Sequence, residues 1–282
     1  MLDAVGPAEL RVIANTGDDV EAYGVHVAPD PDLVTYWLAD AIDERGYGIR
    51  GDTWQVMDAL EAAGLPTWFR LGDRDLAMCL IRTGLLRAGE RLTLAHAAVV
   101  SAMGVAAGVL PMADEPVRTQ VRVGGEWLSL QEFLIVRRAQ GPLEAVELRG
   151  VEEARPTPEV FDALERADSI VIGPSNPVIS IGPILALPGM RDALRSSSAP
   201  VVAVSPFVGG RALKGPTELF CEQAGIERTA FGVAHAYEDV IDGIVADEDV
   251  DGVPVFRANT VMDSADSRRR VAQEVLDVGA TL

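Results

Sequence analysis

Lysine is almost absent from this sequence of 282 residues, because Lys214 is the only lysine among 24 basic residues. Acidic residues number 43, which leaves a formal net charge of -19. This charge argues against a surface for nucleic acid or anionic membrane, because the field of the whole molecule repels phosphates. We therefore expect neither nucleic acid nor membrane as a partner, and any phosphate ligand needs a local site.

Cysteine and histidine are also scarce. The cysteines are Cys79 and Cys221, and the histidines are His26, His96 and His235. Their spacing is not typical of a zinc site, and no serine-histidine signature of a hydrolase is present. No apolar run has the length that spans a bilayer, and we recognise no secretory leader. With two cysteines in a long chain, we expect a protein of the reducing cytoplasm.

Apolar residues make up 48% of the sequence, which is enough for a substantial core. Apolar strands alternate with amphipathic helical stretches along most of the chain, and this alternation is typical of an α/β fold. We predict one catalytic domain over residues 1–282. Within it, residues 40–110 are expected to form a mainly helical insert or subdomain.

Capping residues and periodicity predict the individual elements. Within the insert, helices are expected over residues 52–63, 73–87 and 92–107, the first capped by Asp52-Thr53 and the second by Asp73. A hairpin is expected over residues 117–130, and Ser129 with Glu132 matches a capping box. From Leu143 the pattern predicts parallel α/β elements again: strands over 143–149, 169–172 and 200–205, and helices over 157–166 and 264–278.

Four carboxylates follow the first predicted strand, Arg11-Val12-Ile13-Ala14. They belong to Asn15-Thr16-Gly17-Asp18-Asp19 and to Pro29-Asp30-Pro31-Asp32. A strand that ends in a polar, glycine-containing turn delivers its side chains to the carboxyl edge of a sheet, where open α/β proteins bind ligands. The carboxylates favour a hard-metal or hydroxyl-activating site. Solvated turn residues would give the same pattern, because short motif matches often mislead.

Two later strands are each followed by a loop of small residues. The first loop is Gly173-Pro174-Ser175-Asn176-Pro177, and the second runs from Ser205 through Arg211 to Lys214-Gly215. The first is not a Walker loop, and its prolines remove amides that a phosphate nest would use. Together the loops can hold the two ends of a nucleotide, with Arg211 or Lys214 neutralising phosphate charge. Rigid turns with solvated cations are the alternative.

Trp68-Phe69-Arg70 places two aromatic rings beside a guanidinium group. This combination suits a flat, polar ligand. Packing of both rings in the core is the alternative, since aromatic residues are usually core residues.

Five segments in order resemble the 2-phospho-L-lactate transferases of coenzyme F-420 biosynthesis, including the bacterial enzymes that use a phosphoenolpyruvyl donor. The resemblance runs from about Val12 to the C-terminus. The segments are Asn15-Thr16-Gly17-Asp18-Asp19, Pro29-Asp30-Pro31-Asp32, Gly51-Asp52-Thr53-Trp54, Leu71-Gly72-Asp73-Arg74-Asp75-Leu76, and Gly173-Pro174-Ser175-Asn176-Pro177 continuing to Leu185. Five ordered segments are far more specific than any one of them.

The resemblance implies a Rossmann-like, three-layer parallel α/β enzyme that is commonly a homodimer. It implies a guanylyl-activated three-carbon phosphoacid as donor and the deazaflavin Fo as acceptor. The acid-bearing phosphoryl group would move to the terminal ribityl hydroxyl of Fo, with release of GMP and with Mg²⁺ neutralising charge. The donor acid remains open between lactyl, glyceryl and enolpyruvyl, because these differ by few atoms.

The same resemblance assigns the site residues. Asp18 and Asp32 match metal-proximal carboxylates and are the catalytic and Mg²⁺-binding candidates, with Asp19 and Asp30 behind them. Asp32, Arg70 and Trp68 are expected at the deazaflavin. The guanine nucleotide is expected along the two loops of small residues, at Gly173, Ser175, Asn176, Ser205, Arg211, Lys214 and Gly215.

The beginning of the chain departs from the family pattern. Family members resemble one another in opening with an apolar strand and a Gly-Gly-x-Gly-Gly type of loop. Here Met1 to Leu10 precede the first strand, and Gly6 is their sole glycine. We therefore expect the chain as written to bind guanine nucleotide poorly and an added upstream strand to restore binding, which calorimetry on both versions tests.

Two other functions are compatible with the residues. One is a non-catalytic regulator that binds a nucleotide-sugar on a related Rossmann-like core, and it would need no Fo site. The other is a magnesium-dependent phosphatase, which would release phosphate without an acceptor, although no aspartyl-nucleophile motif is present.

Overall fold

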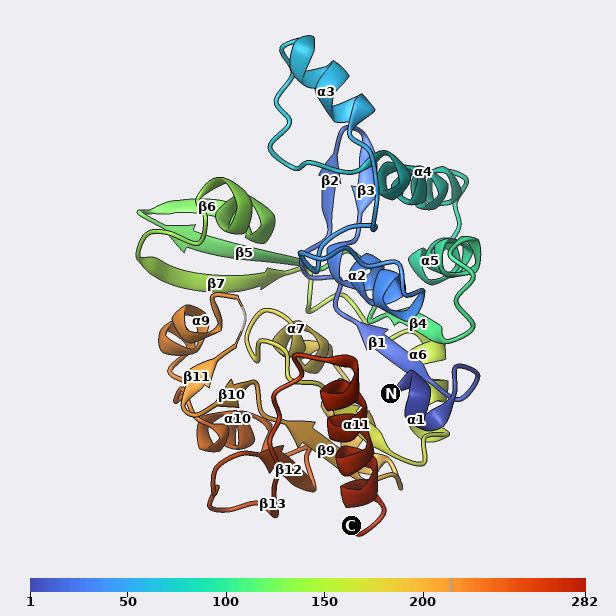
Figure 1. The fold of residues 1–282 in the computed structure, drawn as a ribbon. Coiled ribbons are helices and arrows are strands. Elements are labelled where there is room, and N and C mark those ends of the chain that lie inside the picture. The colour runs from blue at the N-terminus through green and yellow to red at the C-terminus, as the bar shows by residue number, and fades with distance from the viewer. Residues whose placement is uncertain (214) are drawn as a thin grey trace.

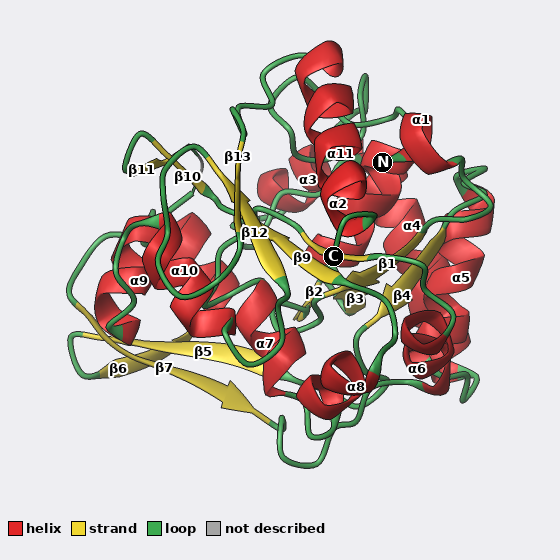
Figure 2. Ribbon diagram, turned by 90° about the horizontal axis from the view of Figure 1, so that it is seen from below, coloured by secondary structure: helices red, strands yellow, loops and turns green. Residues whose placement is uncertain are grey.

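A parallel sheet forms the centre of the C-terminal half of the protein (Figures 1 and 2). The computed structural model describes residues 1–213 and 215–282, with backbone alone for residues 2 and 3. The order of the four strands is β13-β12-β9-β8. Their bounds are Ile170–Ile172 for β8, Val201–Val204 for β9, Gly243–Ala246 for β12 and Val255–Arg257 for β13. The strands predicted over 169–172 and 200–205 are confirmed.

Strand β9 shows why this sheet is covered on both faces. All four of its residues are buried. Val201 and Ala203 pack with helices on one face, and Val202 and Val204 pack with α11 (Ala265–Gly279) on the other. The first face is covered by α6 (Pro158–Glu165), α7 (Ile181–Ala186), α8 (Met190–Ser196) and α10 (Ala230–Tyr237). Figure 2 shows α11 on the opposite side of the strands from α7 and α8. The predicted three-layer α/β arrangement is therefore confirmed.

A second parallel pair joins β1 (Arg11–Ala14) to β4 (Gly108–Pro111). Strand β4 was not predicted from the sequence, and the helix predicted over residues 92–107 ends earlier than predicted. Helix α5 covers Leu92–Ala102, and the chain turns at Gly104, whose φ is 69°. That left-handed conformation suits glycine and ends the helix before the strand begins.

The helices predicted after residue 52 exist, but their predicted caps are wrong. Helix α3 covers Gln55–Ala62 and helix α4 covers Asp73–Arg87. Asp73 accepts hydrogen bonds from the amides of Gln55 and Val56 at the start of α3. Asp52 accepts hydrogen bonds from the amides of Arg74 and Asp75 at the start of α4. Each carboxylate thus satisfies the free amides of the other helix, an exchange that depends on tertiary structure.

An antiparallel sheet of β5 (Arg118–Val123), β6 (Glu126–Ser129) and β7 (Leu143–Arg149) projects to one side (Figure 1). The predicted hairpin is confirmed as β5 and β6. The prediction that parallel elements resume at Leu143 is wrong, because β7 pairs antiparallel with β5. A π-helix, η1 (Glu132–Val136), lies between β6 and β7.

The remaining elements complete the chain between these sheets. Strands β2 (Val20–Ala22) and β3 (Val25–Val27) form a hairpin that lies below α3 in Figure 1. The others are α1 (Leu2–Val5), α2 (Pro29–Leu38), β10 (Phe207–Val208), β11 (Arg211–Ala212) and α9 (Thr217–Ala224). Within the described residues, no helix combines the length and the apolar character needed to cross a membrane. The division into one domain with an insert over residues 40–110 stays a prediction.

Candidate functional site: an acidic turn at the carboxyl end of β1

The turn after β1 is held by Asn15. Its side-chain Oδ1 accepts a hydrogen bond from the Gly17 amide at 2.7 Å. Its Nδ2 donates to Asp30 Oδ2 at 2.9 Å and to the carbonyl of Ile179 at 3.2 Å. One buried amide therefore joins the turn after β1 to the start of α2 and to the segment after β8. The sequence segments containing Asp18, Asp30 and Asn176 are brought together by these contacts, as the position behind the strand predicts.

Gly17 is required at its position by close packing. A Cβ atom there would lie 2.7 Å from Thr119 Oγ1 and 2.8 Å from Asn15 Oδ1. Both distances are too short for any side chain to be accommodated without movement. The antiparallel sheet that carries Thr119 is therefore seated directly against the acidic turn.

Asp18 is the least compensated carboxylate of the site. It is 7% exposed, and its Oδ2 accepts a hydrogen bond from Gln131 Nε2 at 2.9 Å. Its Oδ1 is buried without a hydrogen-bond partner among the described residues. Burial raises the pKa of Asp18 well above its ordinary value, and the negative charges of Asp30 and Asp19 raise it further.

Asp19 and Asp30 extend this acidic group. Asp19 Oδ2 lies 2.8 Å from His26 Nε2, and Asp19 Oδ1 is buried without a partner among the described residues. Burial raises the pKa of Asp19, and the contact with His26 opposes the rise. Burial, followed by the charge of Asp19, raises the pKa of Asp30 to about 6, while the hydrogen bond from Asn15 opposes this. Negative charge on these carboxylates is therefore unfavourable in the folded protein unless a cation balances it.

Such a group fits Mg²⁺, which binds oxygen ligands and usually retains several waters. Among the described residues, the oxygens of this turn that are buried without a hydrogen-bond partner are Asp18 Oδ1, Asp19 Oδ1 and the Thr16 hydroxyl. Asp18 is the residue that would hold the ion. The ion would supply charge neutralisation for a transferred phosphoryl group.

Asp32 lies in a different environment from Asp18. It is 3% exposed in the first turn of α2, and Arg82 donates to both of its oxygens, at 2.7 and 2.8 Å. Arg82 is fully buried and also donates to the carbonyl of His26. The charge of Asp32 is thus balanced by a bidentate ion pair. The contacts group Asp18 with Asp30 and Asp19 and place Asp32 with Arg82, while the proposed metal role of Asp32 stays a prediction.

A second group of possible ligands, made of Asp32, Asp75 and Cys79, lies beside Arg82. The Tyr36 hydroxyl donates to Asp75 Oδ1 at 2.7 Å, and Arg82 Nη2 lies 3.6 Å from Cys79 Sγ. Burial raises the pKa of the Cys79 thiol strongly, and the charge of Asp32 raises it further. A guanidinium already occupies this group and the thiol stays protonated, so it is a poor site for a cation.

Replacing Asp75 by Asn is expected to raise stability at pH 8 and to leave it nearly unchanged at pH 4. Burial, followed by the charge of Asp32, raises the pKa of Asp75 from 3.8 to about 7. Between these values the folded state binds a proton that the unfolded state has lost, so stability falls as pH rises from about 4 to about 7. The gain at pH 8 should be a few kcal/mol. Urea unfolding at the two pH values measures it, with exposed Asp251→Asn as the control. An equal effect at both pH values would contradict this explanation.

The first predicted nucleotide loop is held by Asn176. Its Oδ1 accepts hydrogen bonds from the amides of Val178 and Ile179, at 2.9 and 3.3 Å. Its Nδ2 is buried without a partner among the described residues. The Ser175 amide donates to the carbonyl of Gly173, and a Cβ atom added at Gly173 would meet no atom within 4 Å. The loop therefore offers a free amide donor and open space beside Gly173, and its role in binding nucleotide stays a prediction.

The second predicted nucleotide loop follows β9. Ser205 is buried, and its Oγ accepts a hydrogen bond from the Phe207 amide. Arg211 is exposed on β11, and Gly215 has a φ of 65°. Lys214 lies outside the described residues. Of the residues expected at the nucleotide, Ser205 is engaged within its own turn, whereas Arg211 is exposed.

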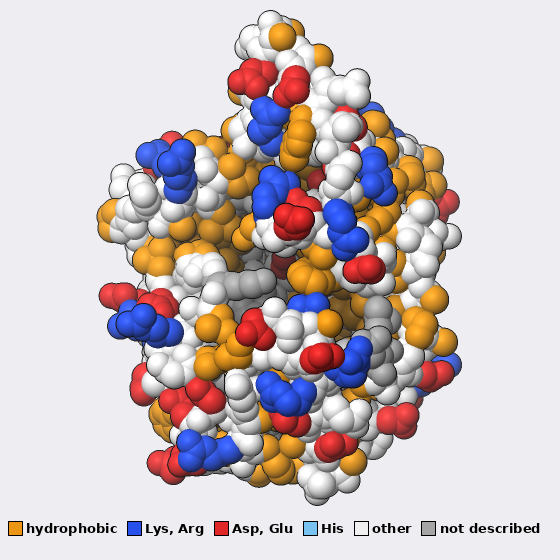
Figure 3. Space-filling view, viewed as in Figure 1, with side chains coloured by type: hydrophobic (Ala, Val, Ile, Leu, Met, Phe, Trp, Pro, Cys, Tyr) orange, Lys and Arg blue, Asp and Glu red, His pale blue; other side chains and the backbone are white. Residues whose placement is uncertain are grey.

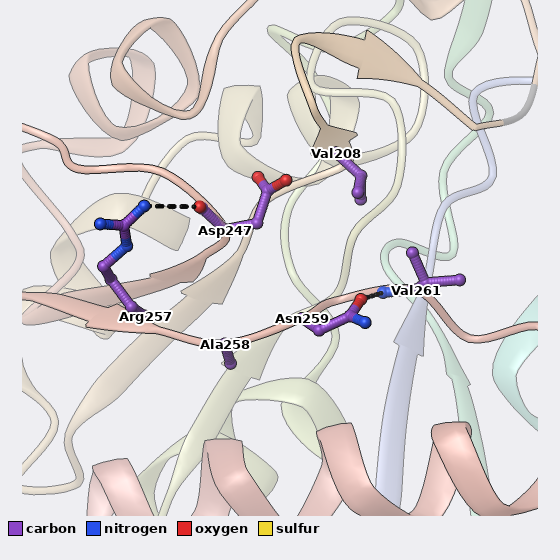
Figure 4. Close-up of a pocket in the computed structure, with 6 residues that line it drawn as sticks. All are labelled: Val208, Asp247, Arg257, Ala258, Asn259 and Val261. Carbon is purple, nitrogen blue, oxygen red and sulfur yellow. Dashed lines mark hydrogen bonds between the residues drawn. The ribbon is translucent and has the colours of Figure 1, made fainter.

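A cavity of about 510 Å³ lies at the carboxyl ends of β12 and β13 and was missed by sequence reasoning (Figure 4). Asp247 Oδ2 accepts a hydrogen bond from the Gly209 amide, which ties this cavity to the second loop. Arg257 donates to the backbone carbonyl of Asp247. The lining residues are Val208, Asp247, Arg257, Ala258, Asn259 and Val261. The acidic residue directly after the buried strand ending at Ala246 was the sequence signal that could have found it.

Trp68 and Arg70 belong to the region around α3. Arg70 pairs with Asp58 at 2.7 Å and with Glu61 at 3.0 Å, and its guanidinium lies over the ring of Trp54. Trp68 packs edge-on against Phe69. The ion-pair partners of Arg70 lie on α3, whereas Arg82 and His96, which face Asp32, lie on α4 and α5, so the structure leaves Arg70 and Asp32 in separate networks. Figure 3, which has the same view as Figure 1, shows acidic and basic side chains interspersed over the visible face of the molecule.

These features define an α/β protein whose acidic turn and small-residue loops follow parallel strands, where this class of fold binds its ligands. The sequence profile of the family described as 2-phospho-L-lactate transferase CofD matches residues 2–274. The chain therefore belongs to this family, and membership identifies it as a transferase. The resemblance stated from the sequence is confirmed.

Individual relatives agree with this assignment. The chain is 37% identical over 278 residues to the 2-phospho-L-lactate transferase of Methanosarcina mazei, covering 95% of this chain and 91% of that protein. It is 41% identical over 255 residues to the phosphoenolpyruvate transferase of Kitasatospora aureofaciens, covering 88% of this chain and 79% of that protein. A solved structure from Bacillus halodurans has a TM-score of 0.60 at 17% identity, covering 94% of this chain and 91% of that one, which supports the fold alone.

Proposed function

We propose that this protein transfers a 2-phospho-L-lactyl or phosphoenolpyruvyl group from a guanosine diphosphate-linked donor to Fo in coenzyme F-420 biosynthesis. The ribityl hydroxyl oxygen of Fo forms a bond to the phosphorus that bears the three-carbon acid. The bond from that phosphorus to the GMP oxygen breaks, and the hydroxyl proton is lost. The products are a phosphodiester and GMP.

The observation that carries this proposal is the buried acidic turn at the carboxyl end of β1, in a chain whose family match spans residues 2–274. A transferred phosphoryl group needs its negative charge neutralised and its oxygens positioned. Asp18 Oδ1 and Asn176 Nδ2 are both buried without a partner among the described residues. The first is suited to hold Mg²⁺ for this purpose, and the second, in the loop after β8, is suited to bind a phosphate oxygen.

A product assay tests the function. The protein is incubated with Mg²⁺, Fo and, in separate reactions, the lactyl, glyceryl and enolpyruvyl guanylyl donors. We expect a phosphodiester of Fo and an equal amount of GMP with a three-carbon donor, identified by mass. The absence of a phosphodiester with all three donors contradicts the proposal. Titration of Fo alone then separates the rival functions, because a nucleotide-sugar regulator gives no saturable change in deazaflavin absorbance.

Arg70→Gln is expected to weaken Fo binding about tenfold or more, because the charge-assisted hydrogen bond proposed to the acceptor is lost. The fold should tolerate this change, because the Arg70 ion pairs with Asp58 and Glu61 are exposed. Fluorescence titration of Fo measures the affinity. Arg137→Gln, which removes an exposed ion pair with Glu126 on the antiparallel sheet, is the matched control. Equal Fo affinity of the two variants would remove Arg70 from the acceptor site.

A further inference from the structure

Gln131 joins the acidic turn to the antiparallel sheet. It is 8% exposed between β6 and η1, and its Nε2 donates to Asp18 Oδ2 at 2.9 Å. The two residues are 113 positions apart in the sequence. Because Oδ2 is engaged in this bond, Oδ1 is the Asp18 oxygen without a partner among the described residues.

The backbone around Gln131 is fixed on both sides. The Ser129 amide and hydroxyl donate to Glu132 Oε2, and the Glu132 amide donates to Ser129 Oγ. Leu130 and Phe133 are both buried in the core of the antiparallel sheet. The π-helix η1 begins directly after Gln131, and such helices are rare and are found frequently at functional sites. The direction of the Gln131 side chain is therefore set by a rigid segment.

A backbone contact fixes the same sheet to the acidic turn one residue earlier. The Thr119 amide donates to the carbonyl of Gly17 at 2.5 Å. The close approach of Thr119 Oγ1 to Gly17 leaves no room for a Cβ atom. The sheet and the turn are thus held together at Gly17 and Asp18, which are consecutive residues.

The two aspartates of the site differ in the charge of their partners. Arg82 binds both oxygens of Asp32 with a guanidinium group and cancels its charge. Gln131 binds one oxygen of Asp18 with a neutral amide, which brings no positive charge to the carboxylate. A neutral donor can orient a carboxylate without competing with a cation for it.

We propose that Gln131 is a positioning residue, which holds Asp18 Oδ2 so that Oδ1 remains oriented for Mg²⁺. This inference rests on the proposed function and adds the antiparallel sheet to the site. The sheet supplies no metal ligand here. It fixes the orientation of one.

The test compares three variants. Gln131→Met removes the amide at similar side-chain length, and Gln131→Asn keeps the amide but shortens the side chain by one methylene. Gln140→Met makes the first change at an exposed position of the same region and is the matched control. Mn²⁺ binding without substrates is measured by water-proton relaxation, with Mg²⁺ as competitor. We expect both Gln131 variants to bind Mn²⁺ roughly 10- to 100-fold more weakly, and the control to be unchanged.

Steady-state kinetics supply a second readout. The Mg²⁺ concentration that gives half-maximal turnover should rise with both Gln131 variants, while KM for Fo stays unchanged. If Gln131 had a purely structural role, its variants would lower the melting temperature without raising the required Mg²⁺ concentration independently of KM for Fo. If Gln131→Met does not fold, Gln131→Asn decides the question.

Asp18→Asn distinguishes a failure of the inference about Gln131 from a failure of the assignment of Asp18 to the metal. Loss of Mn²⁺ binding in Asp18→Asn together with parental affinity in the Gln131 variants overturns the inference and leaves the proposed function standing. Parental Mn²⁺ affinity in Asp18→Asn overturns both the inference and the assignment of Asp18 to the metal.

Discussion

Replacing Asp18 by Asn is expected to lower turnover about 10²- to 10³-fold, the effect of removing one electrostatic stabiliser of a developing charge. The same substitution should make the metal-free protein more stable at pH 8. Burial and the charges of Asp30 and Asp19 raise the pKa of Asp18, so its ionised form is unfavourable in the folded state. Asn keeps an oxygen to accept the hydrogen bond from Gln131 and removes the repelled charge.

Two measurements on the same preparation check this prediction. Turnover is followed by GMP release over a range of Mg²⁺ concentrations, and stability is followed by thermal unfolding with a chelator present. The exposed Asp168→Asn is the matched control, and both of its values should stay at those of the parent protein. Unchanged kinetics would remove Asp18 from the mechanism. A lower melting temperature would show that Asp18 is a structural carboxylate.

Opposite effects on activity and stability are typical of residues that serve function at the expense of folding. Asp18 has that character because its partner is neutral and its neighbours are acidic. Bound Mg²⁺ should reverse the sign of the stability effect, since the ion binds the folded protein and stabilises it by mass action.

Local sequence patterns were sufficient to predict the layers of the fold. Strand β9 is a run of four buried apolar residues, Val201–Val204, and such runs are typical of a parallel strand covered on both faces. The cap of α6 was also predictable, because Thr157 accepts a hydrogen bond from the amide of Val160 within its own first turn. In both cases the deciding interactions lie within a few residues, or depend only on burial.

Non-local pairing explains the errors. Strand β7 has an ordinary strand sequence, and its antiparallel direction is set by its register with β5. The exchange of caps between Asp52 and Asp73 requires the starts of α3 and α4 to be adjacent. The spacing of residues along the chain indicates neither the direction of β7 nor the adjacency of α3 and α4. It therefore predicted the elements but not how they pair and contact one another.

The residues of the candidate site also differ in whether local sequence could predict them. Asp18 was found because it directly follows a strand and a glycine turn. Gln131 and Arg82, which determine what Asp18 and Asp32 can do, were missed because they lie 113 and 50 positions away from them. A weak signal for Arg82 was present, since it is a single charged residue within the apolar run from Leu76 to Leu86.

Replacing Arg82 by Met should destabilise the protein by about 3–5 kcal/mol, the usual cost of leaving one member of a buried ion pair without its partner. Arg82 is fully buried, binds both oxygens of Asp32 and donates to the carbonyl of His26. Exposed Arg50→Met, which removes an ion pair with Asp40, is the matched control and should cost at most about 1 kcal/mol. Urea unfolding of each variant gives the free energies.

The double variant Arg82→Met with Asp32→Leu tests whether the cost comes from the isolated charge. With both charges removed, much of the stability should return, because a buried ion pair can be replaced by apolar residues at little cost. Activity should not return with it, since the proposed acceptor contact of Asp32 is lost. If the double variant is as unstable as Arg82→Met alone, the lost bond to the His26 carbonyl and the lost packing are responsible. Arg82 would then stabilise the β3 strand rather than the charge on Asp32.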